Sequence, residues 1–173
     1  MPETTPSFHD RFVDLFDAHF QRLYRYLDRL SGEPELASDL AQEAFIRLYR
    51  RGSLPDAPEA WLISVALNLF RNAATSRSRH RRLLTVERGA AVHSDPEPSP
   101  EQTAVDEDAG GRVRSALARL PERERRLLLL RSEGFSYRDI AAALELNEAS
   151  VGTLLARART AFREIYKEAS DAS

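Results

Sequence analysis

Apolar residues at the start of the chain recur at helical spacing. From residue 8 to residue 27 they follow one another mostly at steps of three and four, which gathers on one helix face Phe8, Phe12, Leu15, Phe16, Phe20, Leu23 and Leu27. The stretch SGEPEL interrupts this pattern, and Pro34 suits the first turn of a following helix. The sequence therefore predicts an amphipathic helix, a short break and a second helix.

The second helix, expected over residues 34–51, has an apolar half and a polar half. Its helical wheel groups Leu36, Leu40, Ala41, Ala44, Phe45 and Leu48 on one side, and Asp39, Gln42, Glu43, Arg47 and Arg50 on the other. Ile46 lies among the polar residues. A hydrophobe inside a charged rim is typical of a surface that binds a partner. A solvent-facing helix with one isolated Ile fits the same pattern.

The remaining segments also predict helices. GSLPDAP predicts a loop, and a third helix begins near Ala57 at its end. GRVRSALARL predicts a short helix that Pro121 ends. Gly134 ends the next helix, a Ser cap begins SYRDIAAAL, and a turn at 145–147 leads to a last helix over about 148–168. No alternating run bounded by turn residues predicts a strand. The fold class is all-α.

The charge distribution divides the chain into two helical domains and a connector. Residues 1–88 contain 13 Arg and 12 acidic residues, a net charge of +1, and residues 112–173 contain 12 basic and nine acidic residues, a net charge of +3. Residues 89–111 contain six acidic residues and no Lys or Arg. This segment is rich in Pro, Gly and acids and predicts a flexible linker. Two mildly basic domains indicate nucleic acid as a possible partner.

Composition excludes several other classes of function. The chain has no cysteine, and its four histidines are scattered, so we expect no metal and no cofactor. There is no glycine-rich phosphate loop or nucleophile-elbow motif, so we expect no catalytic residues and no enzyme. No apolar run has the roughly 18 residues of a membrane span, and no signal peptide precedes the first helix. We expect a cytoplasmic protein.

The two helical domains together resemble a known family. LPERERRLLLLRSEGFSYRDIAAALELNEASVGTLLARAR resembles the helix-turn-helix of region 4 of bacterial sigma factors. ELASDLAQEAFIRLYRR, followed by AWLISVALNLFRN, resembles region 2 of the same family. A helix-turn-helix alone is common to many regulators, whereas the two regions in this order are specific. The chain resembles the extracytoplasmic-function (group IV) subclass of the sigma-70 family.

This resemblance implies a transcription initiation factor that binds core RNA polymerase, directs it to a promoter set and aids promoter opening. The stretch matching DLAQEAF implies polymerase contacts for Asp39, Gln42, Glu43 and Ile46. Residues 1–88 would recognise and melt the minus-ten element, and residues 112–173 would bind the minus-thirty-five element. An anti-sigma factor is a further possible partner, and in the holoenzyme the protein would be associated with the nucleoid.

The third helix carries the DNA-binding residues expected of the first domain. Between Glu59 and Glu87 there is no acidic residue, and an unopposed basic run suits phosphates because each neutralised phosphate releases a counterion. A solubilising helix end would show the same run. The resemblance adds contacts along the minus-ten element, although Trp61 also suits a core. The expected DNA-binding residues here are Trp61, Asn68, Arg71, Arg77 and Arg79.

The last helix carries few side chains that can read bases. The family often has a Gly in the turn where this chain has Glu145. The expected DNA-binding residues of this domain are Arg138, Ser150, Gly152, Thr153, Ala156, Arg157 and Arg159. Because Gly152, Thr153 and Ala156 are small, we expect this helix to bind mainly through phosphates and DNA shape.

A helix-turn-helix regulator that binds operator DNA without polymerase is the alternative function. The second domain alone would permit it, and dimeric binding to palindromic DNA would support it. Such regulators usually have a βαβ receiver or a sensor domain, whereas the first domain here predicts only helices. The acidic linker fits two roles equally well: a charged tether between the domains, or a segment that mimics nucleic acid.

Overall fold

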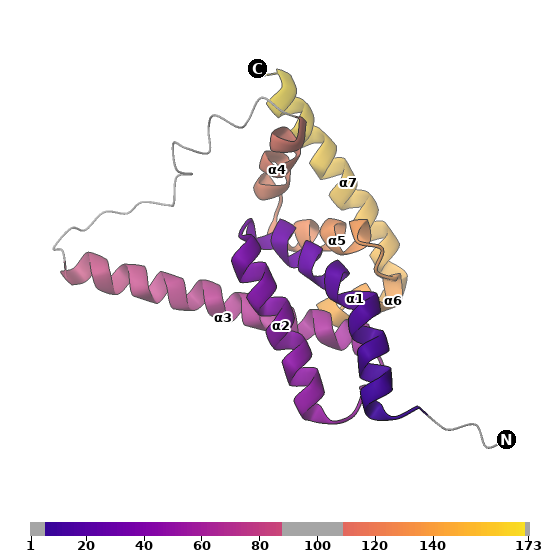
Figure 1. Ribbon diagram of the computed structural model, residues 1–173. Coiled ribbons are helices and arrows are strands. Elements are labelled where there is room, and N and C mark those ends of the chain that lie inside the picture. Colours follow the sequence, from indigo (N-terminus) through magenta and orange to yellow (C-terminus); the bar gives the residue numbers. More distant parts are fainter. Residues whose placement is uncertain (1–5, 88–108, 172–173) are drawn as a thin grey trace.

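The computed structural model describes residues 6–87 and 109–171, and within these residues every regular element is a helix. The helices are α1 (Phe8–Ser31), α2 (Pro34–Arg51), α3 (Pro58–Glu87), α4 (Ala109–Arg119), α5 (Glu122–Ser132), α6 (Tyr137–Leu144) and α7 (Glu148–Asp171). Figure 1 shows their arrangement. The predicted all-α fold class is confirmed.

Local capping explains several of the helix ends. Ser7 and Asp10 form a capping box at the start of α1, in which each side chain accepts from the other residue's backbone N–H. Gly32 and Gly52 end α1 and α2 in the left-handed conformation, as C-terminal glycines commonly do. The Ser136 side chain accepts from the Asp139 N–H and caps α6, as the sequence predicts.

The first three helices form the first domain. α2 packs along α1, and its apolar half is buried through Leu40, Ala41, Ala44, Phe45 and Leu48. α3 packs against both helices through its amino-terminal part, which buries Leu62, Ile63, Ala66 and Leu67. Its carboxyl-terminal half projects away from the rest of the molecule (Figure 1), and residues 74–80 are all exposed.

In the second domain, α4, α5 and α6 pack against the long helix α7. The predicted core stripe of α7 is confirmed at Val151, Leu155 and Ala158, which are buried, whereas Phe162 and Ile165 are half-buried. α4 already begins at Ala109, so residues 109–111 belong to a helix and not to the predicted linker 89–111. Gly111 is buried and α4 packs on α7, which explains the earlier start. Residues 89–108 lie outside the described part of the chain.

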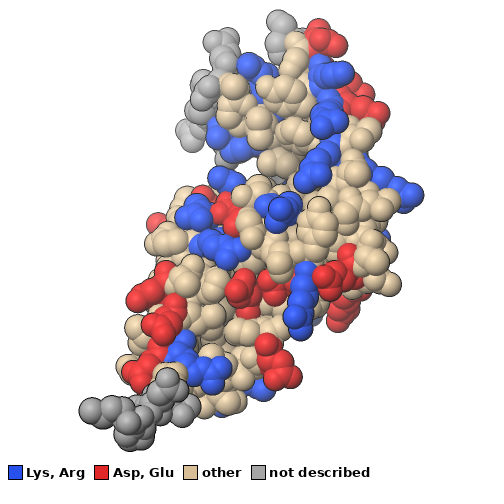
Figure 2. Space-filling model, turned by 90° about the vertical axis from the view of Figure 1, so that its right-hand side faces the viewer, with Lys and Arg blue, Asp and Glu red and all other residues tan. Residues whose placement is uncertain are grey.

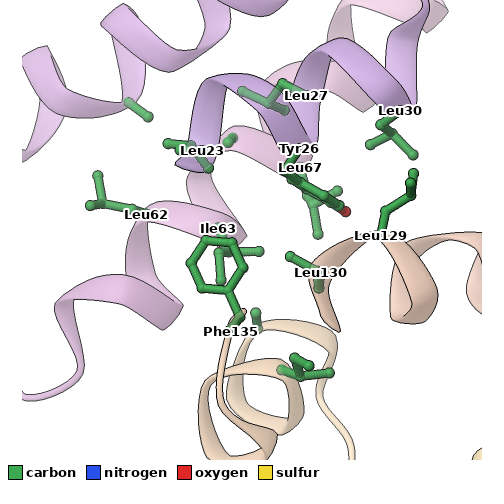
Figure 3. Packing of buried hydrophobic residues seen from close by; sticks show 14 of the residues in the cluster. Leu23, Tyr26, Leu27, Leu30, Leu62, Ile63, Leu67, Leu129, Leu130 and Phe135 are labelled. Atoms are coloured by element: carbon green, nitrogen blue, oxygen red, sulfur yellow. The ribbon is translucent and has the colours of Figure 1, made fainter. Parts of the chain in front are cut away.

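The two domains share one hydrophobic core, which the sequence did not predict. Figure 3 shows Phe135, from the loop between α5 and α6, beside Ile63 of α3, and Leu129 and Leu130 of α5 facing the side chains of α1. Phe135 and Ile63 are 2% and 0% exposed. The packing of α5 and α6 against α1 and α3 therefore buries large apolar side chains from both domains.

Candidate functional site

The polar side of α2 presents a continuous surface. Asp39, Gln42, Glu43 and Ile46 follow the spacing i, i+3, i+4, i+7, which places them on one side of the helix. Gln42 Nε2 donates to Ser38 Oγ at 2.9 Å. Ile46 is 42% exposed although it is a large aliphatic residue, and Glu43 is half-buried. We call these four residues the α2 row. The structure brings all four expected polymerase contacts together.

An exposed aromatic cluster, which the sequence analysis missed, lies beside the α2 row. The rings of Phe12 and Tyr49 are 5.0 Å apart, and those of Phe16 and Phe45 are 5.1 Å apart. Tyr49 is 50% exposed and Phe16 is 37% exposed. Tyr49 comes three residues after Ile46, and this helical spacing could have predicted that the two side chains are neighbours on the surface of α2. The apolar part of the α2 surface is therefore larger than Ile46 alone.

Trp61 and Asn68 lie on a face of α3 that the second domain partly covers. Trp61 is half-buried against the core, whereas Asn68 is exposed. Ser64 lies between them at helical spacing, and its hydroxyl donates to the Ala143 carbonyl oxygen of α6 at 3.5 Å. The structure thus places α6 against the face that was expected to meet the minus-ten element.

The basic residues of α3 lie on its projecting half. Arg71, Arg77 and Arg79 are exposed, which suits contact with a phosphate backbone. Arg77 donates to the carboxylate of Glu33, at the start of α2, and this ion pair raises the pKa of Arg77. Arg77 therefore has an acidic partner within the chain, which DNA would have to displace.

The exposed face of α7 is slightly hollowed and carries several small side chains. Thr153, Ala156 and Arg157 line a shallow depression of about 400 Å³ with three further residues of α7, Thr160, Ala161 and Glu164. Figure 2 shows a row of Lys and Arg side chains on the upper part of the molecule, at the height of α7. Asp and Glu side chains are more frequent in the lower half of the same view. This face combines positive charge with a surface that a DNA backbone can approach closely.

The other expected residues of the second domain lie around this face. Ser150 and Arg159 of α7 and Arg138 of α6 are exposed. Gly152 differs, because it is half-buried and the Tyr137 ring lies against it. Gly152 therefore acts in helix packing and is not part of the open face.

Three arginines of α1 bind the end of α5. Arg25 Nε and Arg29 Nη1 each lie 2.8 Å from a carboxylate oxygen of Glu133, and Arg22 Nε donates to the Glu133 carbonyl oxygen at 3.0 Å. The Arg22 guanidinium also lies 4.3 Å from the centre of the Phe135 ring. This cluster was not predicted from the sequence. Its signal was the spacing of Arg22, Arg25 and Arg29, which puts them on one side of α1.

The described part of the chain contains neither a metal site nor a membrane-spanning helix. Over residues 6–87 and 109–171, no three His, Asp or Glu side chains approach closely enough to hold a metal ion. In the same part of the chain, no helix has the length and apolar character needed to cross a membrane.

Comparison with protein families assigns both halves of the chain. The family model described as Sigma-70 region 2 matches residues 15–80, and the model described as Sigma-70, region 4 matches residues 110–162. The two matched segments correspond to α1–α3 and to α4 through most of α7.

Three curated relatives match over most of the chain. ECF RNA polymerase sigma factor SigE of Mycolicibacterium smegmatis is 34% identical over 154 residues, and the match covers 87% of this chain but only 60% of the relative. RNA polymerase sigma-H factor of Pseudomonas aeruginosa is 31% identical and is covered to 84% of its length, with 87% of this chain. ECF RNA polymerase sigma factor SigL of Mycobacterium tuberculosis is 32% identical, with 89% of this chain and 88% of the relative covered.

A solved structure has the same fold. The sigma factor RpoE of Bartonella quintana, crystallised with the anti-sigma factor NepR, superposes with a TM-score of 0.65 at 22% identity. The match covers 91% of this chain and 97% of that chain.

Proposed function

The chain belongs to the extracytoplasmic-function sigma factors of the sigma-70 family, and we propose that it binds core RNA polymerase, directs it to a specific promoter set and aids promoter opening. The observation that carries the proposal is the α2 row. α2 buries its apolar half in the core and still presents an exposed Ile46 within a rim of Asp39, Gln42 and Glu43. A hydrophobe surrounded by polar groups is the arrangement that anchors a protein interface.

We propose that the two domains divide promoter recognition. Residues 1–88 would engage the minus-ten element through α3, with the exposed Arg71 and Arg79 on phosphates and Asn68 on a base edge. Residues 112–173 would engage the minus-thirty-five element through the open face of α7. The small Thr153 and Ala156 on that face favour phosphate contacts and DNA shape over dense base readout.

The remaining assignments follow from family membership. Sigma factors in general are not enzymes, and we propose that this chain has no catalytic activity of its own. The Bartonella quintana relative of the same fold was solved with an anti-sigma factor, and we propose a similar partner for this chain. A transcription factor of this kind acts in the cytoplasm and would be associated with the nucleoid when bound to polymerase.

Reconstitution with core RNA polymerase tests the proposed function. The purified chain should comigrate with core polymerase and support run-off transcription from a subset of a promoter library. Failure to bind core polymerase would overturn the proposal. Binding to palindromic DNA as a dimer, without polymerase, would instead support a conventional helix-turn-helix regulator.

A further inference from the structure

The outer face of α7 carries charges of both signs around its shallow depression. Among the residues that line it, Arg157 and Glu164 have long charged side chains, and the short Thr160 and Ala161 lie between them along the helix. Figure 1 shows α7 along one edge of the molecule, with α4 and α5 on its inner side. We call the lining residues the α7 hollow: Thr153, Ala156, Arg157, Thr160, Ala161 and Glu164.

The two charges of the α7 hollow are not neutralised within the protein. Arg157 and Glu164 are exposed, and neither forms an ion pair within residues 6–87 and 109–171. They are seven residues apart, almost two full turns, so they lie on one line of the helix about 10.5 Å apart. The Glu164 carboxylate repels the phosphates of DNA. Phosphate binding by Arg157 therefore does not explain this end of the hollow.

The middle of the α7 hollow can be covered at little cost. The Thr160 hydroxyl donates to the Ala156 carbonyl oxygen at 3.2 Å, so it keeps its hydrogen bond when water is excluded. The side chains of Ala156 and Ala161 are single methyl groups. Such short side chains let the axis of another helix approach to about 8 Å. The hollow therefore suits a second helix whose own face is equally short.

The charge pattern of the α7 hollow is complementary to itself in one orientation. In an antiparallel pair of α7 helices with a twofold axis between residues 160 and 161, Arg157 of each copy faces Glu164 of the other, because the two residues are equally far from the axis. In a parallel pair, Arg157 would face Arg157 and Glu164 would face Glu164, which is repulsive. The pattern thus favours an antiparallel pair.

We propose that the α7 hollow binds a second copy of this chain, with the two α7 helices antiparallel and joined by two Arg157–Glu164 ion pairs. This face is much smaller than a standard interface of about 800 Å² per partner, so we expect a dissociation constant on the order of 100 µM. The association is a property of the free chain, whereas its effect on transcription rests on the proposed function. The dimer covers Thr153 and Arg157, so α7 binds either a second copy or the minus-thirty-five element.

Sedimentation velocity of the free chain from about 10 µM to about 1 mM tests the association. The wild type should pass from monomer to dimer over this range, and less so at high salt, because exposed ion pairs are screened. Arg157→Glu and Glu164→Arg each turn both ion pairs into repulsions and should weaken association at least about tenfold. Arg163→Glu is the matched control, because Arg163 is exposed on α7 but points about 120° away from Arg157.

A mixture of the two single variants tests the pairing directly. Arg157→Glu gives a chain with acids at both positions, and Glu164→Arg gives a chain with bases at both, so a mixed pair again forms two attractive contacts. The mixture should associate about as strongly as the wild type, although neither variant does so alone. A wild type that stays monomeric up to about 1 mM would overturn the proposal, as would a mixture that stays monomeric.

Run-off transcription with preformed holoenzyme measures the consequence for promoters. An excess of free wild-type chain, at about 100 µM, should reduce transcription, because it covers α7 in competition with DNA. The same excess of chain carrying Glu164→Arg should have a much smaller effect. Equal effects of the two chains would overturn the competition with DNA. Failure of the wild type to bind core polymerase would overturn the proposed function and leave the association standing.

Discussion

The ring of Tyr137 lies against the backbone of Gly152, with its Cε2 atom 3.5 Å from the position that a Cβ on Gly152 would take. Arg131 lies on the same ring, with its guanidinium carbon 5.4 Å from the ring centre. A residue with a long side chain at 152 would have to displace the ring. The small residue near the start of α7 therefore lets α6 and α7 approach each other.

Gly152→Ala should stabilise the protein. A distance of 3.5 Å is ordinary van der Waals contact, so a methyl group fits, and Ala favours a helix interior over Gly by about 0.8–1.0 kcal/mol. We expect a gain of about 0.5–1 kcal/mol in the free energy of unfolding, measured by denaturant titration. Gly152→Leu should cost about 1–3 kcal/mol by overpacking against Tyr137. Destabilisation by Ala would show that the helices are closer than described.

Ile46→Ala should weaken polymerase binding without affecting folding. Loss of an interface anchor typically costs about 1–2 kcal/mol, which is about a 5- to 30-fold loss of affinity for core polymerase. The melting temperature should change little because Ile46 is already 42% exposed. Val113→Ala on α4, at a residue 38% exposed, is the matched control and should bind core polymerase normally. Equal losses in both variants would contradict a specific role for the α2 row.

Glu33→Gln should increase affinity for promoter DNA. Glu33 pairs with Arg77 on the surface, and exposed pairs are worth about 0.2–1 kcal/mol, so release of Arg77 should raise affinity by about 1.5- to 5-fold at low salt. Arg77→Gln should lower affinity and reduce the dependence of binding on salt. Filter binding of holoenzyme at several salt concentrations measures both effects. Unchanged affinity in Glu33→Gln would mean that Arg77 does not contact DNA.

Two substitutions on the face of α7 should separate phosphate binding from base reading. Arg157→Ala should weaken use of all promoters alike and reduce the salt slope of binding by about one, as expected for one phosphate contact. Thr153→Ala should have a modest effect. Run-off transcription across a promoter panel measures both. A strong, promoter-selective loss in Thr153→Ala would show that α7 reads more of the sequence than its small side chains indicate.

Tyr26 should remain un-ionised in alkaline solution. Burial raises the pKa of Tyr26 above its ordinary value of 10.0, and its hydroxyl has no hydrogen-bond partner. The unfolded chain ionises this group as the pH passes 10, so stability is full below that pH and falls as the pH rises toward the folded pKa. Absorbance titration of the wild type, compared with Tyr26→Phe, should show no ionisation of Tyr26 until the protein unfolds.

Tyr26→Phe is the companion variant. It removes an unpaired buried hydroxyl and should raise the free energy of unfolding by about 1 kcal/mol. The loss of stability above pH 10 should also become smaller. Destabilisation by Phe would indicate that the hydroxyl has a partner, such as a bound water.

Periodicity and capping residues predicted the helices well because both act within a few residues of sequence. The Ser7 capping box and the burial of Val151 and Leu155 are examples, since each depends on neighbours three or four positions away. The turn before α7 was also predicted, but its backbone was not. Glu145 has a φ of 56°, a conformation that favours Gly, which fits the Gly that the family often has there.

Contacts between distant segments could not be predicted in the same way. Glu133 meets Arg25 across 108 positions, and nothing near Glu133 in the sequence distinguishes it from the exposed acids. The exposure of Tyr49 depends on how α1 lies on α2, because Phe12 covers only part of its ring. Similarly, the ion pair of Arg77 with Glu33 could not be predicted from the sequence, because it depends on the angle between α3 and α2.

The projecting half of α3 has a consequence for the thermodynamics of DNA binding. Helical segments shorter than about 12–15 residues are marginal in water, and residues 74–80 have no buried side chain to support them. Phosphates that neutralise Arg71 and Arg79 would also remove the repulsion between like charges along this segment. Duplex DNA would then stabilise the projecting half of α3, and the free energy of this stabilisation would add to the affinity for DNA.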